Sequence, residues 1–427
     1  MTRFESVLAK NAPLRSTARS QLENTIIPWW DQHGADDVRG GVFTCFSNGG
    51  VLESTEKYTW SQGRWAWLCA EIAEDSARGI LDFDSKLWSR RAVSTAQFLV
   101  DHALLSDGHT VFRLSESGEP LPSGENGELS VSVFADLFVA LGLARVARLS
   151  DCPAPLQNRC EKAADAILET AARQVTDRSA VSEPYPIAAG FFAMAGPMTL
   201  LHVGSETSRL NKSKISTRVF TEALIELVVG SERESLFAND RWWEVRPDSE
   251  LDIDTLLARH KTPGHLLECL WMLIHAADNA AETVTLPAWL PDLAIRALEV
   301  GWDDDDGGLF RYVDQDGGAP HGRLLGMDRY EDLIVNTWDT KLWWVHVEAM
   351  YATALLAERF HREDLEAWYR RIADYTFVTF PGAAGQEWIQ IRDRAGQPFN
   401  QVVALPVKDP FHIARSLLLI NRLEQSA

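Results

Sequence analysis

Cysteine is scarce in this sequence and does not occur in a redox or metal-binding spacing. The 427 residues contain five cysteines, and no two of them form a Cys-x-x-Cys pair. The first residues, Met1–Glu5, have no apolar run of the kind found in a secretory leader. An odd number of thiols without a leader predicts reduced cysteines and a cytoplasmic protein rather than a disulfide scaffold.

Basic residues are outnumbered, and long apolar runs are missing. There are 41 lysines and arginines against 61 aspartates and glutamates, which gives a formal net charge of -20. Such a surface repels phosphate backbones and anionic lipids, so we expect neither nucleic acid nor a membrane as a partner. No stretch reaches the ~18 uninterrupted apolar residues of a membrane helix.

The common cofactor and metal motifs are also missing. The sequence has no G-x-G-x-x-G fingerprint, no P-loop, and no H-E-x-x-H or H-x-H pair. Residues 303–306 are all aspartates, but they lack the spacing and the closing glutamate of a calcium loop. Ser61 and Ser205 lie outside any nucleophile elbow. We therefore expect no metal and no nucleotide or redox cofactor.

Helical periodicity, by contrast, covers most of the sequence. Residues 131–146 and 266–274 are apolar on every side, as in a buried helix, whereas 362–375 has one polar face. Alternating buried and half-exposed helices predict an all-α fold of two concentric rings, in a single domain over residues 1–427. Twelve segments show the helical period: 13–30, 58–76, 86–104, 130–149, 155–175, 188–206, 213–231, 264–279, 288–300, 340–359, 363–378 and 410–424.

Short β-like segments lie in the connectors between these helices. No β-α-β alternation accompanies them, so a parallel sheet is not expected. Three of the segments run into acidic or glycine-rich turns, and we expect each of these three to form a local hairpin. The β-like segments are 41–46, 110–114, 308–313 and 387–391, and the turns are 47–50, 314–318 and 392–396.

Two histidines occupy matching positions at the starts of two predicted helices. His265 follows Thr-Pro-Gly and His412 follows Asp-Pro-Phe, so each comes after an N-capping residue and a proline. Three residues later on the same helix face lies a charge, Glu268 in one case and Arg415 in the other. A helix N-terminus disfavours imidazolium, and a neutral imidazole is what a general base needs. The alternative is a pair of hydrogen-bonded core histidines, but the repeated register favours the functional interpretation.

An arginine lies between two tryptophans on a third predicted helix. Trp60, Arg64 and Trp67 are four and three residues apart, so they share one face. A guanidinium on so apolar a helix must be paired internally or must face a polar cavity, and both interpretations stay open. The sequence contains 16 tryptophans, which suits a sugar site, although most of them will belong to the core.

Residues 341–350 combine two tryptophans, a histidine and a carboxylate at one helix start. Trp344 and Glu348 share one face, and Trp343 and His346 share another. A carboxylate on this helix needs a partner or a substrate hydroxyl. For His346 we favour a core position.

Nine short motifs occur in a characteristic order along the chain. They are Gly41-Val42-Phe43-Thr44-Cys45, Trp60-Ser61-Gln62-Gly63-Arg64, Pro263-Gly264-His265, Gly301-Trp302-Asp303, Gly307-Gly308-Leu309, Lys341-Leu342-Trp343-Trp344, Glu348-Ala349-Met350, Glu387-Trp388 and Pro410-Phe411-His412. Together they resemble the N-acylglucosamine 2-epimerase family over nearly the whole chain. The resemblance implies a single (α/α)6 barrel that interconverts sugars at C2, or an aldose and a ketose, without a metal or redox cofactor.

The resemblance also implies roles for individual residues. His265 and His412 match the two acid/base histidines of the family, and Arg64 matches the arginine that polarises the substrate carbonyl. Glu268 matches the carboxylate beside the first histidine. The expected substrate-binding residues are further positions that match the family's pocket, together with Trp60 and Arg415, which lie on the same predicted helices as Arg64 and His412. The full set is Trp60, Arg259, Trp343, Trp344, Glu348, Trp388 and Arg415.

Two segments bear on the substrate. Residues 194–201 lack the additional inner-helix histidine of cellobiose 2-epimerases and mannose isomerases, and they resemble the N-acylglucosamine branch. Residues 408–410 depart from the ending that the family has before Phe-His. We expect a 2-epimerase of the N-acyl-D-glucosamine/N-acyl-D-mannosamine type that moves the C2 proton between two histidines.

Other functions stay open. An aldose–ketose isomerase acting on mannose or a related free hexose shares the first proton abstraction. A glycoside hydrolase on the same barrel would need two carboxylates, for which Glu268 and Glu348 are the candidates. A non-catalytic sugar-binding protein is a further alternative. The expected partner is a small-molecule sugar, and a homodimer is left open.

The charges that follow the two histidines predict unequal basicity. Glu268 should make His265 the more basic, whereas Arg415 should favour the neutral form of His412. The helix N-termini act on both alike. On this hypothesis His412 starts as the base on one epimer, and His265 returns the proton.

Overall fold

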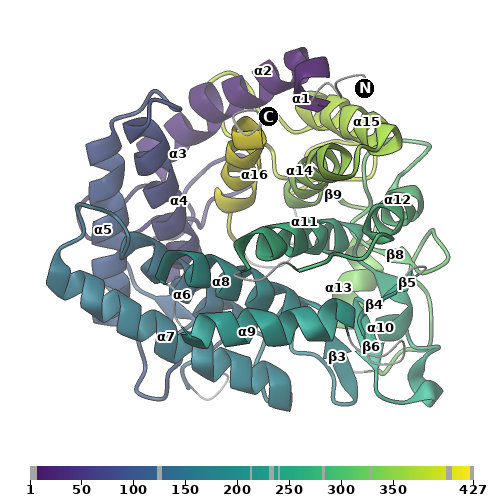
Figure 1. Cartoon of the computed structure of the whole chain (residues 1–427), viewed down its shortest axis with the longest axis horizontal. Helices are drawn as coiled ribbons and strands as arrows, with labels where there is room; N and C mark the ends of the chain where they lie inside the picture. The colour runs from purple at the N-terminus through teal and green to yellow at the C-terminus, as the bar shows by residue number, and fades with distance from the viewer. Residues whose placement is uncertain are drawn as a thin grey trace.

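A closed ring of six helices forms the centre of the molecule (Figure 1). The computed structural model describes residues 7–122, 127–211, 214–229, 235–238, 241–280, 284–326, 329–400 and 406–423. Each inner helix packs against the next, and the last packs against the first, so the ring closes. The inner helices are α4 Thr59–Ala77, α6 Val133–Val146, α8 Ala195–Asn211, α11 Pro263–Asn279, α14 Trp343–Phe360 and α16 Phe411–Leu423.

A second layer of helices surrounds this ring. The chain alternates between an outer and an inner helix throughout, and the predicted (α/α)6 barrel is confirmed. The prediction of one domain over residues 1–427 stays a prediction. The outer helices are α2 Ala12–Gln21, continued through η1 Leu22–Ile26 into α3 Ile27–His33, then α5 Ser85–His102, α7 Ala154–Asp177, α9 Lys214–Leu224 with η2 Ile225–Val229, α12 Leu290–Gly301 and α15 Glu363–Thr379.

The inner helices are those whose sequences are apolar on every side. α6 and α11 are buried almost throughout, whereas α15 buries only one stripe. α4 and α6 approach each other very closely, and two glycines allow it. A Cβ on Gly63 would lie 2.2 Å from the carbonyl oxygen of Phe138, and a Cβ on Gly142 would lie 2.3 Å from that of Gly63. No other residue type fits at this crossing without moving backbone.

The connections at the two ends of the barrel differ in length. Connections from an inner helix out to the next outer helix are short: 78–84, 147–153, 212–213, 280–289 and 361–362. Connections from an outer helix into the next inner helix are long: 34–58, 103–132, 178–194, 230–262, 302–342 and 380–410. The long connections all lie at the end of the barrel where the inner helices begin.

Three two-stranded antiparallel sheets stand directly before three inner helices. β1 Lys57–Tyr58 pairs with β2 Arg113–Leu114, β7 His260–Lys261 with β8 Val313–Asp314, and β9 Lys341–Leu342 with β10 Ile391–Arg392. The predicted β-like segments thus contribute strands, but the expected local hairpins reduce to isolated bridges such as Phe46↔Leu52 and Arg392↔Pro398. The prediction gave β8 and β10 the wrong partners. Each pairs instead with a strand that stands before an inner helix, because that strand offers a buried edge. The remaining strands are β3 Phe191–Ala193 paired with β6 Val245–Pro247, and β4 Phe237–Ala238 paired with β5 Arg241–Trp242.

A buried lysine repeats in two of these sheets. The Nζ of Lys57 donates to Asp36 at 2.7 Å and to the carbonyl oxygen of Gly40 at 2.8 Å. The Nζ of Lys341 makes a similar pair of contacts, with Asp303 at 3.0 Å and with the carbonyl oxygen of Gly308, the second glycine of its turn, at 3.3 Å. Both acceptor turns read Asp-x-x-x-Gly-Gly, so this unit is an internal repeat.

All twelve predicted helices occur, with differences at their ends. The helix predicted at 188–206 begins only at Ala195, because 191–193 pair as a strand with β6. Residues 213, 230, 231 and 424, at the ends of predicted helices, lie outside the described residues. In the described part of the chain, no helix is long and apolar enough to span a membrane. Four elements too short to show a period were not predicted: α1 Val7–Lys10, α10 Leu256–Arg259, α13 Arg329–Thr337 and η3 Glu250–Asp252.

Candidate functional site

A cavity of about 660 Å³ opens at the end of the barrel where the inner helices begin. The first turns of all six inner helices contribute to its wall, so six positive helix ends face one space. In a chain of net charge -20, this is a place where a developing negative charge is stabilised. His265, His412, Arg64 and Glu268 all line it, as the sequence predicts.

His265 lies in the first turn of α11, after the predicted N-cap Thr262 and Pro263. Its Nδ1 is 2.7 Å from Oε1 of Glu244, a buried carboxylate from the loop before β6. Burial opposes the charged imidazolium, but the ion pair and hydrogen bond with Glu244 outweigh burial and raise the pKa of His265. The sequence prediction named Glu268 as the partner. The structure corrects this, since Glu268 turns toward α16 and adds only a weaker, more distant attraction.

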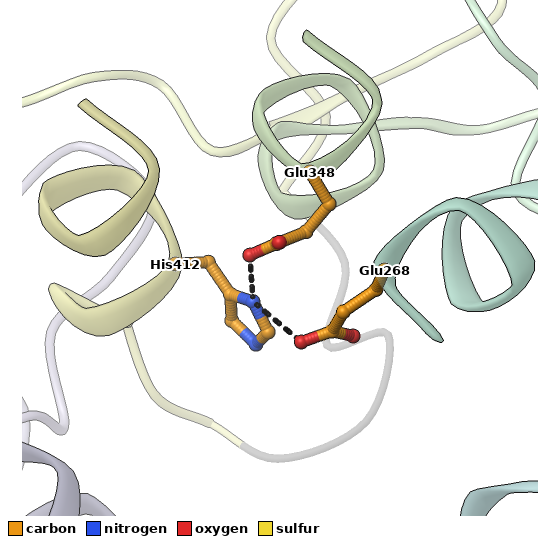
Figure 2. A group of neighbouring side chains, drawn as sticks. All are labelled: Glu268, Glu348 and His412. Carbon is orange, nitrogen blue, oxygen red and sulfur yellow. Dashed lines mark hydrogen bonds and ion pairs between the residues drawn. The ribbon is translucent and has the colours of Figure 1, made fainter. Parts of the chain in front are cut away.

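His412 lies at the start of α16, where Asp409 accepts the backbone N–H groups of Phe411 and His412. Figure 2 shows its ring between two carboxylates from α14 and α11. Nδ1 is 2.8 Å from Oε1 of Glu348 and 3.8 Å from Oε1 of Glu268. The charge that the sequence predicts beside this histidine is present, because Nη2 of Arg415 lies 3.3 Å from Nδ1. That cation is shared with two carboxylates, so it does not act on His412 alone.

The two imidazoles both contact one tryptophan. The ring centroid of Trp344 is 4.9 Å from that of His265 and 5.9 Å from that of His412. The imidazole centroids are therefore no more than about 11 Å apart, a span that leaves a sugar carbon between them within reach of both rings. Both histidines border this one cavity.

Arg64 points into the same cavity from α4 with few partners. Its guanidinium lies 3.9 Å above the Phe138 ring, and Nη1 is 3.5 Å from Oδ1 of Asp409. Its Nε has no hydrogen-bond partner among the described residues. Burial lowers the pKa of the Arg64 guanidinium, and Asp409 opposes that effect. One long contact does not satisfy a buried arginine, so the geometry favours an open donor over an internal salt bridge.

Glu268, Glu348 and His412 together resemble a metal-ligand set, because their nearest ligand atoms lie within 4.8 Å of one another. The guanidinium of Arg415 already fills the space between them. Its Nη2 is 2.5 Å from Glu268 and 2.7 Å from Glu348. A cation could enter only by displacing a buried arginine, so the residues present do not fit a metal.

One known protein family matches this chain over most of its length. The model of the N-acylglucosamine 2-epimerase (GlcNAc 2-epimerase) family matches residues 40–416. The chain belongs to this family. The N-acylglucosamine 2-epimerases of Bos taurus and Homo sapiens are 25% and 23% identical to it over 405 residues, which is 93% of this chain and 88% and 87% of those proteins. A D-mannose isomerase of Pseudomonas cannabina pv. alisalensis is 28% identical over 186 residues, 42% of this chain and 40% of that protein. The predicted family and the isomerase class of enzyme are both confirmed.

Solved structures support the same fold. The cellobiose 2-epimerase of Bacillus thermoamylovorans B4167 has a TM-score of 0.71 at 17% identity, covering 97% of this chain and 100% of that one. A D-mannose isomerase has a TM-score of 0.71 at 14% identity, covering 96% and 98%. Identities this low show the shared barrel alone, and they do not decide the substrate.

The structure does not bring every predicted residue to the cavity. Trp60, Trp343 and Trp344 line it, and Glu348 and Arg415 lie directly behind it as partners of His412. Trp388 and Arg259 are not among the described residues that line the cavity, which corrects their expected role as substrate contacts. The buried Trp388 donates from Nε1 to Gln21 at 2.7 Å. Arg259 pairs with Asp314, the last residue of β8, at 2.7 Å and with Asp316, in the turn after it, at 2.9 Å. The core position favoured for His346 is confirmed, since its Nε2 accepts from the backbone of Leu309 at 2.9 Å.

Among the residues at the cavity that were not predicted, two bear directly on the chemistry. Glu244 lies in a loop without periodicity, 21 positions before His265, and no local pattern connects the two. His202 follows directly on the segment 194–201, where the sequence comparison found no histidine. It lines the cavity from α8, and its Nε2 has no partner among the described residues. Burial, and next to it the charge of Arg415, lower the pKa of His202 well below its usual value, so this imidazole is neutral.

Proposed function

We propose that this protein is a sugar 2-epimerase that interconverts N-acyl-D-glucosamine and N-acyl-D-mannosamine without a cofactor. The observation that carries the proposal is the pair of imidazoles in one cavity, each with Nδ1 bonded to a buried carboxylate. The separations are 2.7 Å for His265 and Glu244 and 2.8 Å for His412 and Glu348. An Nδ1–H that donates to a carboxylate fixes the tautomer and leaves Nε2 to exchange a proton with the substrate.

The reaction begins with the open-chain sugar, with its C1 carbonyl oxygen at Arg64 and C2 between the imidazoles. Nε2 of one histidine takes the C2 proton, the C–H electron pair forms the C1–C2 double bond, and the C1 oxygen becomes an enolate. The guanidinium of Arg64, which lines the cavity, and the six helix N-termini stabilise that oxygen. The other imidazolium then donates its Nε2 proton to the opposite face of C2. The carbonyl re-forms, and the configuration at C2 is inverted.

Glu268 and Glu348 serve this mechanism as supports. Burial opposes the ionisation of Glu348, but Arg415 and His412 outweigh it and lower the pKa of this carboxyl. The charged carboxylate holds the ring of His412 in place. Both carboxylates bind the same arginine nitrogen, and Glu348 is fully buried, so neither is free as the acid or nucleophile of a glycoside hydrolase.

Aldose–ketose isomerisation of mannose or a related free hexose is the second candidate. His202 is the observation that favours it, because a neutral imidazole with an unpartnered Nε2 can pass a proton between the C1 and C2 oxygens. Isomerisation also needs the proton to return to C1 rather than to C2. Both candidates share the first abstraction, so the product decides between them.

The test is a panel of sugars incubated with the enzyme in heavy water and followed by NMR. N-acetylmannosamine should give N-acetylglucosamine with deuterium at C2, and the deuterium should enter the product before it enters the remaining substrate. A ketose formed from mannose, with no reaction of either N-acetylhexosamine, would replace the proposal by the isomerase. As part of the same proposal we expect a cytoplasmic enzyme, which the five free thiols support.

A further inference from the structure

The cavity extends well beyond the space between the two histidines. At the ~30 Å³ that a liquid water occupies, about 660 Å³ is the space of about 22 waters, whereas an N-acetylhexosamine has about 15 non-hydrogen atoms. The extra room lies along one wall, built from the loop before α8, β3, the end of α7, and α13. We call this wall the aliphatic wing and define it by Val175, Val181, Ile187, Ala188, Phe191 and Leu333.

The aliphatic wing begins beside the candidate catalytic centre. Glu244, which holds His265, is followed directly by β6, and β6 pairs along its length with β3 (Figure 1). The backbone N–H of Met194, at the end of β3, donates to the carbonyl oxygen of Glu244 at 2.9 Å. A hydrogen-bonded pair of strands therefore leads from the carboxylate behind His265 to Phe191 in the wing.

The surface of the wing is apolar and partly open to the cavity, since Ile187, Ala188 and Leu333 pack against the buried cluster that contains Phe191 without being fully covered. Val181 is 44% exposed, and Ile187 and Ala188 are half-buried. Three of the charged side chains at its rim are in ion pairs, since Arg178 lies 2.5 Å from Asp248 and Glu183 lies 3.6 Å from Arg329. An open aliphatic surface inside a ligand cavity binds apolar atoms, whereas the hydroxyls of a second sugar ring would find few free partners there.

We propose that the aliphatic wing binds the acyl chain of an N-acylhexosamine, and that the natural substrate carries an acyl group longer than acetyl. This inference rests on the proposed function. In that mechanism the amide nitrogen is bonded to C2, the carbon between the imidazoles, so the acyl chain starts beside His265. The wing is the apolar surface next to that point.

The experiment compares N-acetyl-, N-propanoyl-, N-butanoyl- and N-pentanoylmannosamine as substrates for the full chain. Each added methylene that enters the wing should raise kcat/KM by about fourfold, which corresponds to about 0.8 kcal/mol per buried CH₂. Ala188→Trp should abolish this gain, so that kcat/KM no longer rises with the length of the acyl chain. Val181→Asp, at a position exposed enough to tolerate the change, should also remove the gain by placing a charge in the wing. Ala319→Trp, at an exposed position away from the cavity, is the matched control and should keep the gain.

The outcomes separate this inference from the proposed function. Turnover of the N-acetyl compound with falling kcat/KM for longer chains would overturn the acyl wing and leave the epimerase intact. Loss of activity on all four compounds in both wing variants alike would also overturn it. Faster turnover of a β-1,4-linked disaccharide, abolished by Ala188→Trp, would assign the wing to a second sugar ring instead. No turnover of any N-acylhexosamine by the wild type would remove the proposed function, and the inference with it.

Discussion

Replacing Glu244 by glutamine removes the charge that holds one of the two candidate bases. Glutamine can still accept the Nδ1–H of His265 through its amide oxygen, so the ring should keep its orientation. What is lost is the difference between a charge-assisted and a neutral hydrogen bond, about 1 to 2 kcal/mol, or about 5- to 30-fold in the population of the imidazolium. Because Glu244 raises the pKa of His265, the substitution should lower it.

The assay is kcat/KM against pH in both reaction directions. Where His265 acts as the base, activity rises as pH rises through its pKa, and this limb should move to lower pH in Glu244→Gln. Where His265 acts as the acid, activity falls as pH rises through the same pKa, and that limb should also move to lower pH, with a loss of about 5- to 30-fold near neutrality. Glu183→Gln is the control, because Glu183 lines the cavity but lies near Arg329 rather than a histidine. A uniform loss at every pH, with both limbs in place, would show that Glu244 does not act through the protonation of His265.

Three further predictions follow. Arg64→Lys should lose about 100-fold in kcat/KM, because lysine lacks the planar fork, while the melting temperature changes little; near-normal turnover would make Arg64 structural. His265→Asn and His412→Asn should each abolish inversion, yet each should still exchange the C2 proton of one epimer with heavy water, and a different epimer in each case; equal loss of exchange from both epimers would refute separate bases. Burial opposes the ionisation of Glu71, but its two arginine partners lower its pKa to about 2. The charge therefore stabilises the fold above the unfolded pKa of about 4.3, and this contribution is lost as pH falls toward 2. Glu71→Gln should cost about 2 to 3 kcal/mol in urea unfolding at pH 7 and converge with the wild type near pH 2, whereas a constant difference would contradict the linkage.

The helices could be predicted from the sequence because their signal is local. An inner helix such as α6 is apolar on every side, and an outer helix such as α15 shows one stripe, so each segment records its own layer. The capping residue and the proline before His265 likewise predicted the first turn of α11. The strands were harder to predict, since a two-residue strand such as β9 pairs with residues about 50 positions further along the chain.

The candidate site was predictable only where its residues stand in motifs. His265, His412 and Arg64 belong to short patterns at helix starts, and the structure places all three at one cavity. Glu244 reaches His265 from a loop without periodicity, so no sequence rule connects them. Glu268 was assigned to His265 by its i+3 spacing. Side chains that are adjacent on a helix can turn toward different neighbours, and here Glu268 accepts a hydrogen bond from Arg415 of α16.

The unequal connections of the barrel divide the chain into two kinds of sequence. The short returns at one end add few residues to the ring. The long entries at the other end, such as 178–194 and 230–262, supply the wing and the partner of His265 without belonging to any ring helix. Evolution can therefore exchange the loops that recognise a sugar while the twelve helices stay in place. In a barrel of this kind the helices can stay fixed while the entry loops change, so a new specificity is best sought in the entry loops.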